Sequence, residues 1–436
     1  MSESQTLSVA QLQAHIDNLS SAIGAQKQIL RGLEEQQSQA RRRLNSVLDP
    51  IARLPLELQS EIFMHCTSAT PTASSLSEPP ALFLHICHLW RDVALSTPRL
   101  WTGLCMDLNS SEPLQILDAW VQRSHNLPFS LWLQALSTLN HGDLSSITSR
   151  FQQRLRELTV ELCPPLSDET TLDWLVHERL SFLEALTLTS DVKLSYAPKQ
   201  WAKLLEATPA LTSLSLENVT WHWRTTLFDT PFRHTSLREL YLGNIQKYIL
   251  DSDFYDSSAA FLSFITLPAL KTLRLTEFCI SQEDFISFFQ RSSPPLTSLT
   301  MVAPEPDSLP QGILPYFVPI EGLENLEYVV GFLNSRDSLV DLLFALSIAP
   351  ILPNLRTLTI SMVPGTHPDY AELMAVLKLR RRSNQRLVSF QLVFVGSFGC
   401  AEFQEDGPDE EAVLGLRELA EEGMDIHVGF RGRNLI

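Results

Sequence analysis

The sequence predicts an α/β chain in which a long N-terminal helix and a small all-α domain precede an irregular solenoid of strand–helix repeats. Two observations predict this. Apolar residues keep a heptad spacing as far as about residue 48. From residue 155 onward, the pattern L-x-x-L-x-L recurs many times. The expected domains are 1–48, 51–108 and 112–436.

Composition and charge narrow the classes of function. Of the 436 residues, 44% are hydrophobic and 19% charged, and the formal net charge is −17. We therefore expect no nucleic-acid partner, because such binding needs a broad positive surface. The basic clusters at residues 41–43 and 378–382 are interpreted as solvated helix faces or nuclear-import patches.

The expected location is cytoplasmic and/or nuclear. The first residues contain no apolar core of the kind that a secretory signal has. No apolar run is long enough to span a membrane, so no membrane partner is expected. The six cysteines have no CxxC spacing, which favours free thiols in a reducing compartment.

The first region is predicted to be a helix with a heptad seam. Apolar residues alternate in steps of three and four over residues 9–47, and Gln26 and Gln37 complete the series of core positions. Gly24 and Gly32 each weaken the helix by about 1 kcal/mol relative to Ala. Two interpretations stay open: a coiled coil that makes a homodimer through residues 9–47, or a single helix that lies on the rest of the protein.

The second region is predicted to be a compact helical domain. Residues 54–66 are expected to form an amphipathic helix with a proline near its first turn. Residues 67–80 are rich in turn formers and are expected to be a loop. A second helix is predicted over residues 81–96, followed by a strand within 99–108.

The residues of this region occur in a characteristic order: Leu54-Pro55, Glu57, Ile62-Phe63, Cys87, Trp90-Arg91, Pro98 and Leu100-Trp101. The segment resembles the F-box, in the form common in large fungal F-box-like families. The resemblance implies docking on the Skp adaptor of a cullin-RING ubiquitin ligase (an SCF complex), while the rest of the chain captures a protein substrate. By position, it implies that the adaptor is contacted or supported by Leu54, Pro55, Leu58, Ile62, Phe63, Cys87 and Trp90.

The third region carries an internal repeat. Successive copies start 26 to 33 residues apart, close to the upper end of the leucine-rich-repeat period, and helical stretches lie between them. Stacked units of this kind form a solenoid with a parallel sheet inside the curve and helices outside. The repeat's usual Asn occurs only at Asn218 and Asn244, so the curvature should be irregular. The copies start at Leu155, Leu183, Leu211, Leu237, Leu270, Leu296, a degraded Leu326, Leu355 and Leu387.

The two ends of this array are expected to be capped. Residues 112–134 should form the first cap, and residues 416–428 should supply a last helix and strand.

The outward row of the predicted sheet offers a candidate surface for target binding. Side chains alternate across a strand, so the residues between the leucines point outward. Most of the residues in this row are small and hydroxylic. Tyr241 and Arg274 are the exceptions, with Glu217 and Glu239 beside them. These four are the candidates for target capture, and ordinary solvated strand residues are the alternative.

No pattern in the sequence predicts an active site. The motifs of common nucleophile elbows, phosphate loops, zinc proteases and dinucleotide sites do not occur. His65, Cys66, His85, Cys87 and His88 match no common zinc spacing, so no metal or cofactor is expected. The predicted function is that of a non-enzymatic ligase adaptor. The alternatives are a protein-interaction scaffold that dimerises through the N-terminal coiled coil, and an enzyme whose site has no sequence signature.

Overall fold

A computed structural model of the 436-residue chain describes most of its length. The described residues are 9–68, 71–72, 77–108, 113–134, 153–162, 175, 179–196, 198–221, 231–243, 261–276, 282–302, 313–330, 335–348, 351–362, 368–382, 387–394, 408, 410–430 and 433–434.

The chain divides into two compact units. The first contains Met1–Leu104 and Ile116–Leu127, and the second contains Cys105–Gln115 and Pro128–Ile436. This division differs from the predicted boundary at residue 112, because most of helix α5 (Pro113–Arg123) belongs to the first unit. Trp120 of α5 lies edge-on to Trp101, with ring centroids 4.9 Å apart, and donates a hydrogen bond to the Gly103 carbonyl at 3.0 Å.

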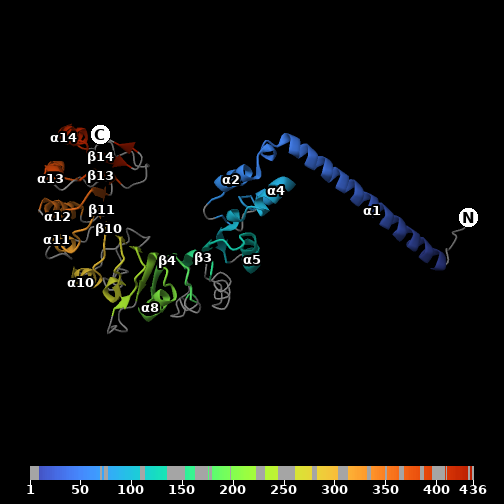
Figure 1. Cartoon of the computed structure of the whole chain (residues 1–436), viewed down its shortest axis with the longest axis horizontal. Coiled ribbons are helices and arrows are strands. Elements are labelled where there is room, and N and C mark those ends of the chain that lie inside the picture. Colours follow the sequence, from blue (N-terminus) through green and yellow to red (C-terminus); the bar gives the residue numbers. More distant parts are fainter. Residues whose placement is uncertain are drawn as a thin grey trace, which may run out of the picture. The chain divides into compact units, whose positions relative to one another are not determined.

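The first unit is helical, as predicted (Figure 1). The predicted helix over 54–66 is confirmed as α2, with Pro55 at its N-cap. The single helix predicted over 81–96 is wrong, because Cys87 is extended (φ −155°, ψ 171°) and separates two helices. The elements are α1 (Val9–Leu48), η1 (Ile51–Arg53), α2 (Leu56–Cys66), α3 (Phe83–Ile86), α4 (His88–Leu95), η2 (Pro98–Trp101) and α5.

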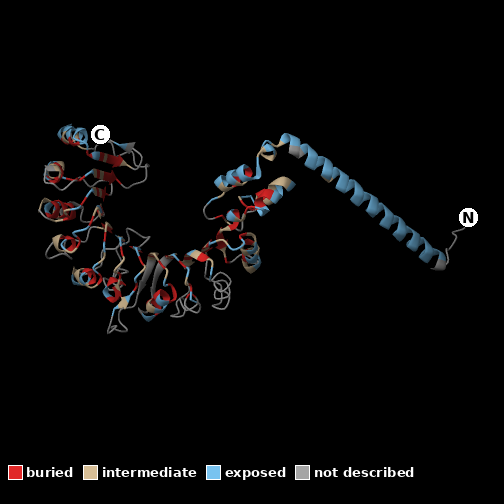
Figure 2. Ribbon diagram, in the orientation of Figure 1, coloured by how far each residue is buried: buried red, intermediate tan, exposed pale blue. Residues whose placement is uncertain are grey.

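Helix α1 is continuous over 40 residues, and its heptad seam is exposed (Figure 2). Leu12, Ile23 and Leu33 are 45%, 54% and 57% exposed. Among the residues that the structure describes, this helix therefore has no apolar surface against which its seam is buried. Within the first unit, the structure does not favour the interpretation that α1 lies on the other described elements.

The second unit contains all but the first two residues of a long, mainly parallel sheet. The sheet has 13 strands in the order β1-β2-β3-β4-β5-β7-β9-β10-β11-β12-β13-β14-β15. Neighbouring strands from β2 to β14 are all parallel, and β15 is antiparallel. The strands are β1 (Gly103–Asp107), β2 (Phe129–Gln134), β3 (Leu155–Leu162), β4 (Ala185–Tyr196), β5 (Ser213–Trp221), β7 (Glu239–Gly243), β9 (Thr272–Leu275), β10 (Ser298–Val302), β11 (Asn325–Val330), β12 (Thr357–Met362), β13 (Ser389–Phe394), β14 (Asp425–Phe430) and β15 (Arg433–Asn434).

The repeat leucines align in register and form the core. Leu214, for example, is opposite Leu186 on one side and Leu240 on the other, and all three are buried. The register corrects the degraded copy. Leu326 is opposite the second leucine of its neighbours, Leu299 and Leu358, so that copy starts at the buried Leu323. The third apolar position of this copy is occupied by Tyr328 in place of an aliphatic residue, so the L-x-x-L-x-L pattern is incomplete there.

Helices lie beside the sheet and alternate with its strands (Figure 1). The expected final helix and strand are confirmed as α14 and β14. The side chain of Asn218, and Asn244 entirely, lie outside the described residues. Of the helices that the structure describes, none is both long and apolar enough to cross a membrane. The helices are α8 (Pro198–Ala207), α9 (Phe261–Phe264), α10 (Gln282–Ser292), α11 (Leu314–Phe317), α12 (Ser335–Ser347), α13 (Tyr370–Arg382) and α14 (Glu410–Glu421), and a separate pair of short strands is β6 (Phe232–Arg233) with β8 (Ile265–Thr266).

Candidate partner-binding surfaces

An aromatic cluster fixes the inner face of α2. Phe63 is fully buried, with its ring stacked on Phe83 at 4.2 Å and tilted against Trp90 at 5.0 Å. Such pairs stabilise a core beyond the area they bury. The structure therefore places Phe63 inside the unit, rather than on the surface that the F-box resemblance implies.

The outer face of α2 presents apolar side chains to solvent. Leu58 and Ile62 are four residues apart, so they lie on one face of the helix. Leu58 is 52% exposed and Ile62 is 36% exposed. At the start of the helix, Pro55 is exposed and Leu54 is half-buried. We call Leu58 and Ile62 the α2 face. Among the residues that the F-box resemblance places at the adaptor, they are the two apolar side chains of α2 that are exposed to solvent.

Trp90 has a structural role in addition to its ring contacts. Its indole Nε1 donates a hydrogen bond of 2.6 Å to the Asp49 carboxylate, whose other oxygen accepts from the Ile51 backbone N at 2.9 Å. Arg53 donates to the Val47 carbonyl at 2.5 Å. The bond between Trp90 and Asp49 connects the segment after α1 to α4, and the other two bonds connect α1 and that segment to η1. Trp90 and Cys87 are both half-buried, so they support the unit more than they form its surface.

Further hydrogen bonds hold α2 in place. Gln59 is buried, and its Nε2 donates to the Leu54 carbonyl at 2.6 Å. The Ser60 and Thr97 hydroxyls lie 2.9 Å apart and bond α2 to the segment before η2. The helix that carries the α2 face is therefore held in place by these hydrogen bonds and by the aromatic contacts of Phe63.

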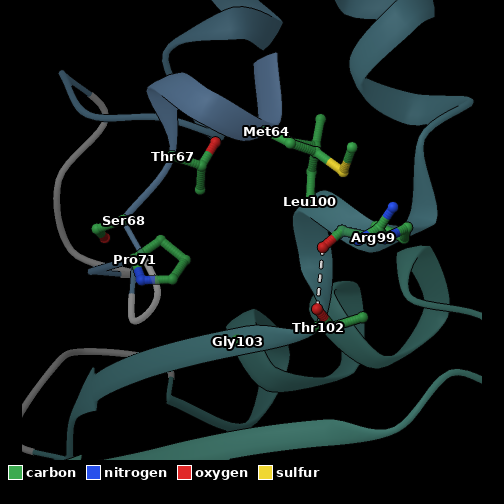
Figure 3. A pocket seen from close by; sticks show the side chains of 8 residues that line it. All are labelled: Met64, Thr67, Ser68, Pro71, Arg99, Leu100, Thr102 and Gly103. Carbon is green, nitrogen blue, oxygen red and sulfur yellow. Dashed lines mark hydrogen bonds between the residues drawn. The ribbon is translucent and has the colours of Figure 1, made fainter. Parts of the chain in front are cut away.

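A pocket lies at the C-terminal end of α2, where no sequence motif predicts one. Figure 3 shows its lining side chains, which come from α2, the segment after it, η2 and the start of β1. The Thr102 hydroxyl donates to the Arg99 carbonyl at 2.9 Å across its edge. The lining residues are Met64, Thr67, Ser68, Pro71, Arg99, Leu100, Thr102 and Gly103. No recurring motif connects them, so the sequence held no signal for this pocket.

The histidines near α2 and α4 lie beside carboxylates. His65 is 3.5 Å from Glu61, and His88 is 2.7 Å from Asp92, each pair one helical turn apart. Within the described residues, no three His, Cys, Asp or Glu side chains converge in a way that could hold a metal ion.

A continuous polar row crosses the sheet of the second unit. Its members are Cα partners on successive strands, and they lie on the face opposite the buried leucines. The register adds Trp132, Glu327 and His427 to the predicted row, because their strands lack a regular leucine motif. The row runs through Trp132, Thr159, Thr187, Ser215, Tyr241, Arg274, Thr300, Glu327, Thr359, Gln391 and His427.

Arg274 is the centre of this row. It is the Cα partner of Tyr241, and its guanidinium carbon lies 5.7 Å from the centroid of the tyrosine ring. On its other side, Nη2 is 4.0 Å from Oε2 of Glu327, which also accepts a hydrogen bond of 3.1 Å from Thr300. The Arg274 side chain remains 54% exposed, so a partner can reach it.

Gly243 makes room for the tyrosine side chain. A Cβ at this position would lie 2.6 Å from the Tyr241 hydroxyl and 2.4 Å from the Thr276 hydroxyl. The two hydroxyls are themselves 3.5 Å apart. The tyrosine can therefore lie along the strand only because the second residue after it has no side chain.

The predicted acidic neighbours take different positions. Glu239 is exposed, two residues before Tyr241, and is the Cα partner of Thr272. Glu217 is opposite Gly243 on the adjacent strand. Glu327 is the carboxylate that the structure places next to Arg274. It lies two strands away from Arg274, so spacing within a single repeat could not have identified it.

One residue of the basic cluster at 378–382 is used inside the fold. Arg380 is buried, and it donates to the carbonyls of Leu346 at 2.7 Å and Leu352 at 3.2 Å. Burial lowers the pKa of Arg380 to about 10. Arg381 donates to the Glu422 carbonyl, and Lys378 lies 3.3 Å from Glu418. The interpretation of this cluster as a solvated face is therefore wrong for Arg380.

Comparisons with known proteins identify no family for this chain. No family model matches it, and no curated protein matches it. Among solved structures, the crystal structure of the Rad7 and Elc1 complex in yeast is similar over 97% of this chain and 98% of that chain. The sequences are 15% identical and the TM-score is 0.38.

Proposed function

We propose that the protein is a non-enzymatic substrate-recognition adaptor of an SCF-type (Skp–cullin–F-box) ubiquitin ligase. The observation that carries the proposal is the α2 face. Leu58 and Ile62 are exposed, while Phe63 beside them is fully buried against Phe83 and Trp90. Exposed apolar side chains on a rigid helix are typical of a binding surface for another protein. They occur within the ordered residues that resemble an F-box.

The second unit would hold the target. Its polar row provides hydroxyl groups for hydrogen bonding, and Tyr241 with Arg274 supplies the residue types that dominate binding hot spots. The mechanism is proximity: binding the target and the ligase at once raises the effective concentration of a target lysine near the ubiquitin carrier. In this proposal the chain performs no chemistry and works in the cytoplasm and/or nucleus.

Affinity purification of the full chain from native lysate tests the adaptor role. The wild-type chain should retain the Skp adaptor and the cullin, whereas Leu58→Asp combined with Ile62→Asp should lose both. Leu414→Asp is the matched control, because Leu414 is 62% exposed on α14 in the other unit. If the wild-type chain retains no adaptor, or if the α2 variant retains as much as the control, the proposal is wrong.

Proximity labelling tests the target surface. Tyr241→Ala combined with Arg274→Glu should remove a subset of the labelled proteins and leave the Skp adaptor labelled. Thr187→Ala with Thr359→Ala, in the same polar row, serves as the control for surface change. Identical labelling by wild type and the first variant would place target binding elsewhere.

A second candidate function is a protein-interaction scaffold, outside any ligase, that dimerises through α1. The exposed seam of α1 favours it. Adaptor retention separates the two functions, because a scaffold of this kind would self-associate without binding Skp.

A further inference from the structure

We infer that α1 forms a parallel, in-register, two-stranded coiled coil with a second copy of this chain. Helix α1 is continuous from Val9 to Leu48, so its backbone presents the whole heptad seam in one line. The side chains of Ile16, Leu19, Leu30 and Leu44 are 54%, 50%, 55% and 56% exposed. A seam of this length exceeds the three to four heptads that typically indicate a coiled coil.

The identities of the core residues in the first half of α1 favour two parallel strands. Val9, Ile16 and Ile23 occupy successive a positions of the heptad. Leu12 and Leu19 occupy the first two d positions. β-Branched residues at a with Leu at d favour a parallel dimer, because each side chain fits the packing geometry of its layer.

The two polar core positions favour a second copy as the partner. Gln26 occupies a d position and Gln37 an a position, and every other residue of the seam is apolar. In a parallel, in-register pair each glutamine meets its own copy, so each amide can donate and accept within one layer. A partner with an unbroken apolar seam would leave both amides buried without a matching group.

The flanking charges are compatible with this arrangement. In a parallel dimer, each g residue lies near the e residue five positions later in the partner. The pairs are His15–Ser20, Ala22–Lys27, Ile29–Glu34, Gln36–Arg41 and Arg43–Leu48, and none brings two like charges together. An antiparallel pair would gain contacts between Lys27 and Glu34. It would lose the layers of Val9 and Leu12, however, and exposed ion pairs contribute little.

The consequence concerns the adaptor surface. Both chains would leave the coiled coil at the same end, where Asp49 and Arg53 connect α1 to the rest of the first unit. A dimer would therefore carry two α2 faces, and it could bind two adaptors or hold a target bivalently. The dimer itself does not depend on the proposed function.

Sedimentation of the full chain tests the dimer. The molar mass measured by sedimentation for the wild type should be twice that of the 49.2 kDa chain. Leu19→Glu with Leu33→Glu should give a monomer, because both positions lie in the seam. Ser21→Glu with Gln28→Glu, which adds the same charge at two outer f positions, should stay dimeric. A monomeric wild type, a trimer, or a dimer that survives the seam variant would overturn the inference.

Disulfide formation tests the orientation. Gln26→Cys should form a covalent dimer under mild oxidation, beyond the background that the native cysteines give in the wild type. Gln28→Cys, on the outer face, should not. In an antiparallel pair Gln26 would lie opposite Gln37. Covalent dimers that form only when Gln26→Cys and Gln37→Cys chains are mixed would therefore overturn the parallel arrangement.

Discussion

Ile62 and Phe63 are adjacent in α2 and have different environments, so they should respond differently to substitution. Phe63 is fully buried between two aromatic rings, and Ile62 is 36% exposed. Phe63→Ala should lower the free energy of unfolding by about 3–5 kcal/mol, because it leaves a cavity. Ile62→Asp should change it by less than about 1 kcal/mol. Chemical denaturation of the two variants checks this, and a Phe63→Ala chain as stable as wild type would contradict the assigned core.

His234 should make stability depend on pH. The His234 side chain is buried, and its Nε2 lies 3.1 Å from the Thr208 carbonyl oxygen. Its Nδ1 accepts a hydrogen bond of 3.2 Å from the Leu237 backbone N. Because Nδ1 must be unprotonated to accept, this arrangement requires the neutral ring. Burial lowers its pKa, partly offset by the bond to Thr208. The unfolded chain therefore binds this proton more readily, and stability should fall as pH drops below about 6.5.

Denaturant unfolding at pH 7 and pH 5 measures this effect. His234→Gln should reduce the loss of stability between the two values, because the amide cannot be protonated. His85→Gln, at an exposed position, is the control for the substitution of a histidine by glutamine. Equal pH dependence in wild type and His234→Gln would contradict the assignment.

Helix α1 contains two glycines whose replacement by alanine should stabilise the helix. A Cβ at Gly24 or Gly32 would meet nothing within 4 Å. Both lie at outer positions of the heptad, so alanine there leaves the seam intact. Gly24→Ala and Gly32→Ala should each stabilise the helix by about 1 kcal/mol. Thermal melting followed by circular dichroism checks this, and a lowered melting temperature would show that these positions are in contact with something.

Arg380 joins α13 to the preceding repeat. Arg380→Met should cost about 2–4 kcal/mol, because the carbonyls of Leu346 and Leu352 lose a charged donor. Lys378→Met, which removes an exposed pair with Glu418, should cost at most about 0.5 kcal/mol. Denaturant unfolding compares the two, and equal costs would contradict the structural role of Arg380.

The sequence pattern predicts helices and strands well where a single residue type, such as leucine or proline, marks their position. The leucine spacing located the repeat strands, and Pro55 located the start of α2. The pattern did not resolve the break at Cys87, whose flanking residues are apolar enough for one helix. It also misplaced the copy that contains Tyr328 by one leucine position.

The candidate sites were harder to predict, because they depend on contacts across the chain. The side of α2 that faces the core is chosen by Phe83 and Trp90, far along the sequence from Phe63. Arg274 was identified from its position in the repeat. Its carboxylate neighbour, Glu327, emerged only from the strand register.

In the whole molecule, the two units present different binding surfaces. The first presents the α2 face and the exposed seam of α1, and the second presents the polar row. Neither unit has a described cluster that could hold a metal ion. The proposed functions use three binding surfaces, the α2 face, the α1 seam and the polar row, and each can be removed by substitution without the others.

Titration calorimetry with purified full chain and purified Skp adaptor measures the proposed adaptor binding itself. We expect one adaptor to bind per chain. The Leu58→Asp with Ile62→Asp variant should bind at least about 30-fold more weakly, because it loses about 2 kcal/mol of apolar burial. Leu414→Asp should bind like wild type. The adaptor function is wrong if the wild-type chain does not bind the Skp adaptor, or if the folded α2 variant binds it equally well.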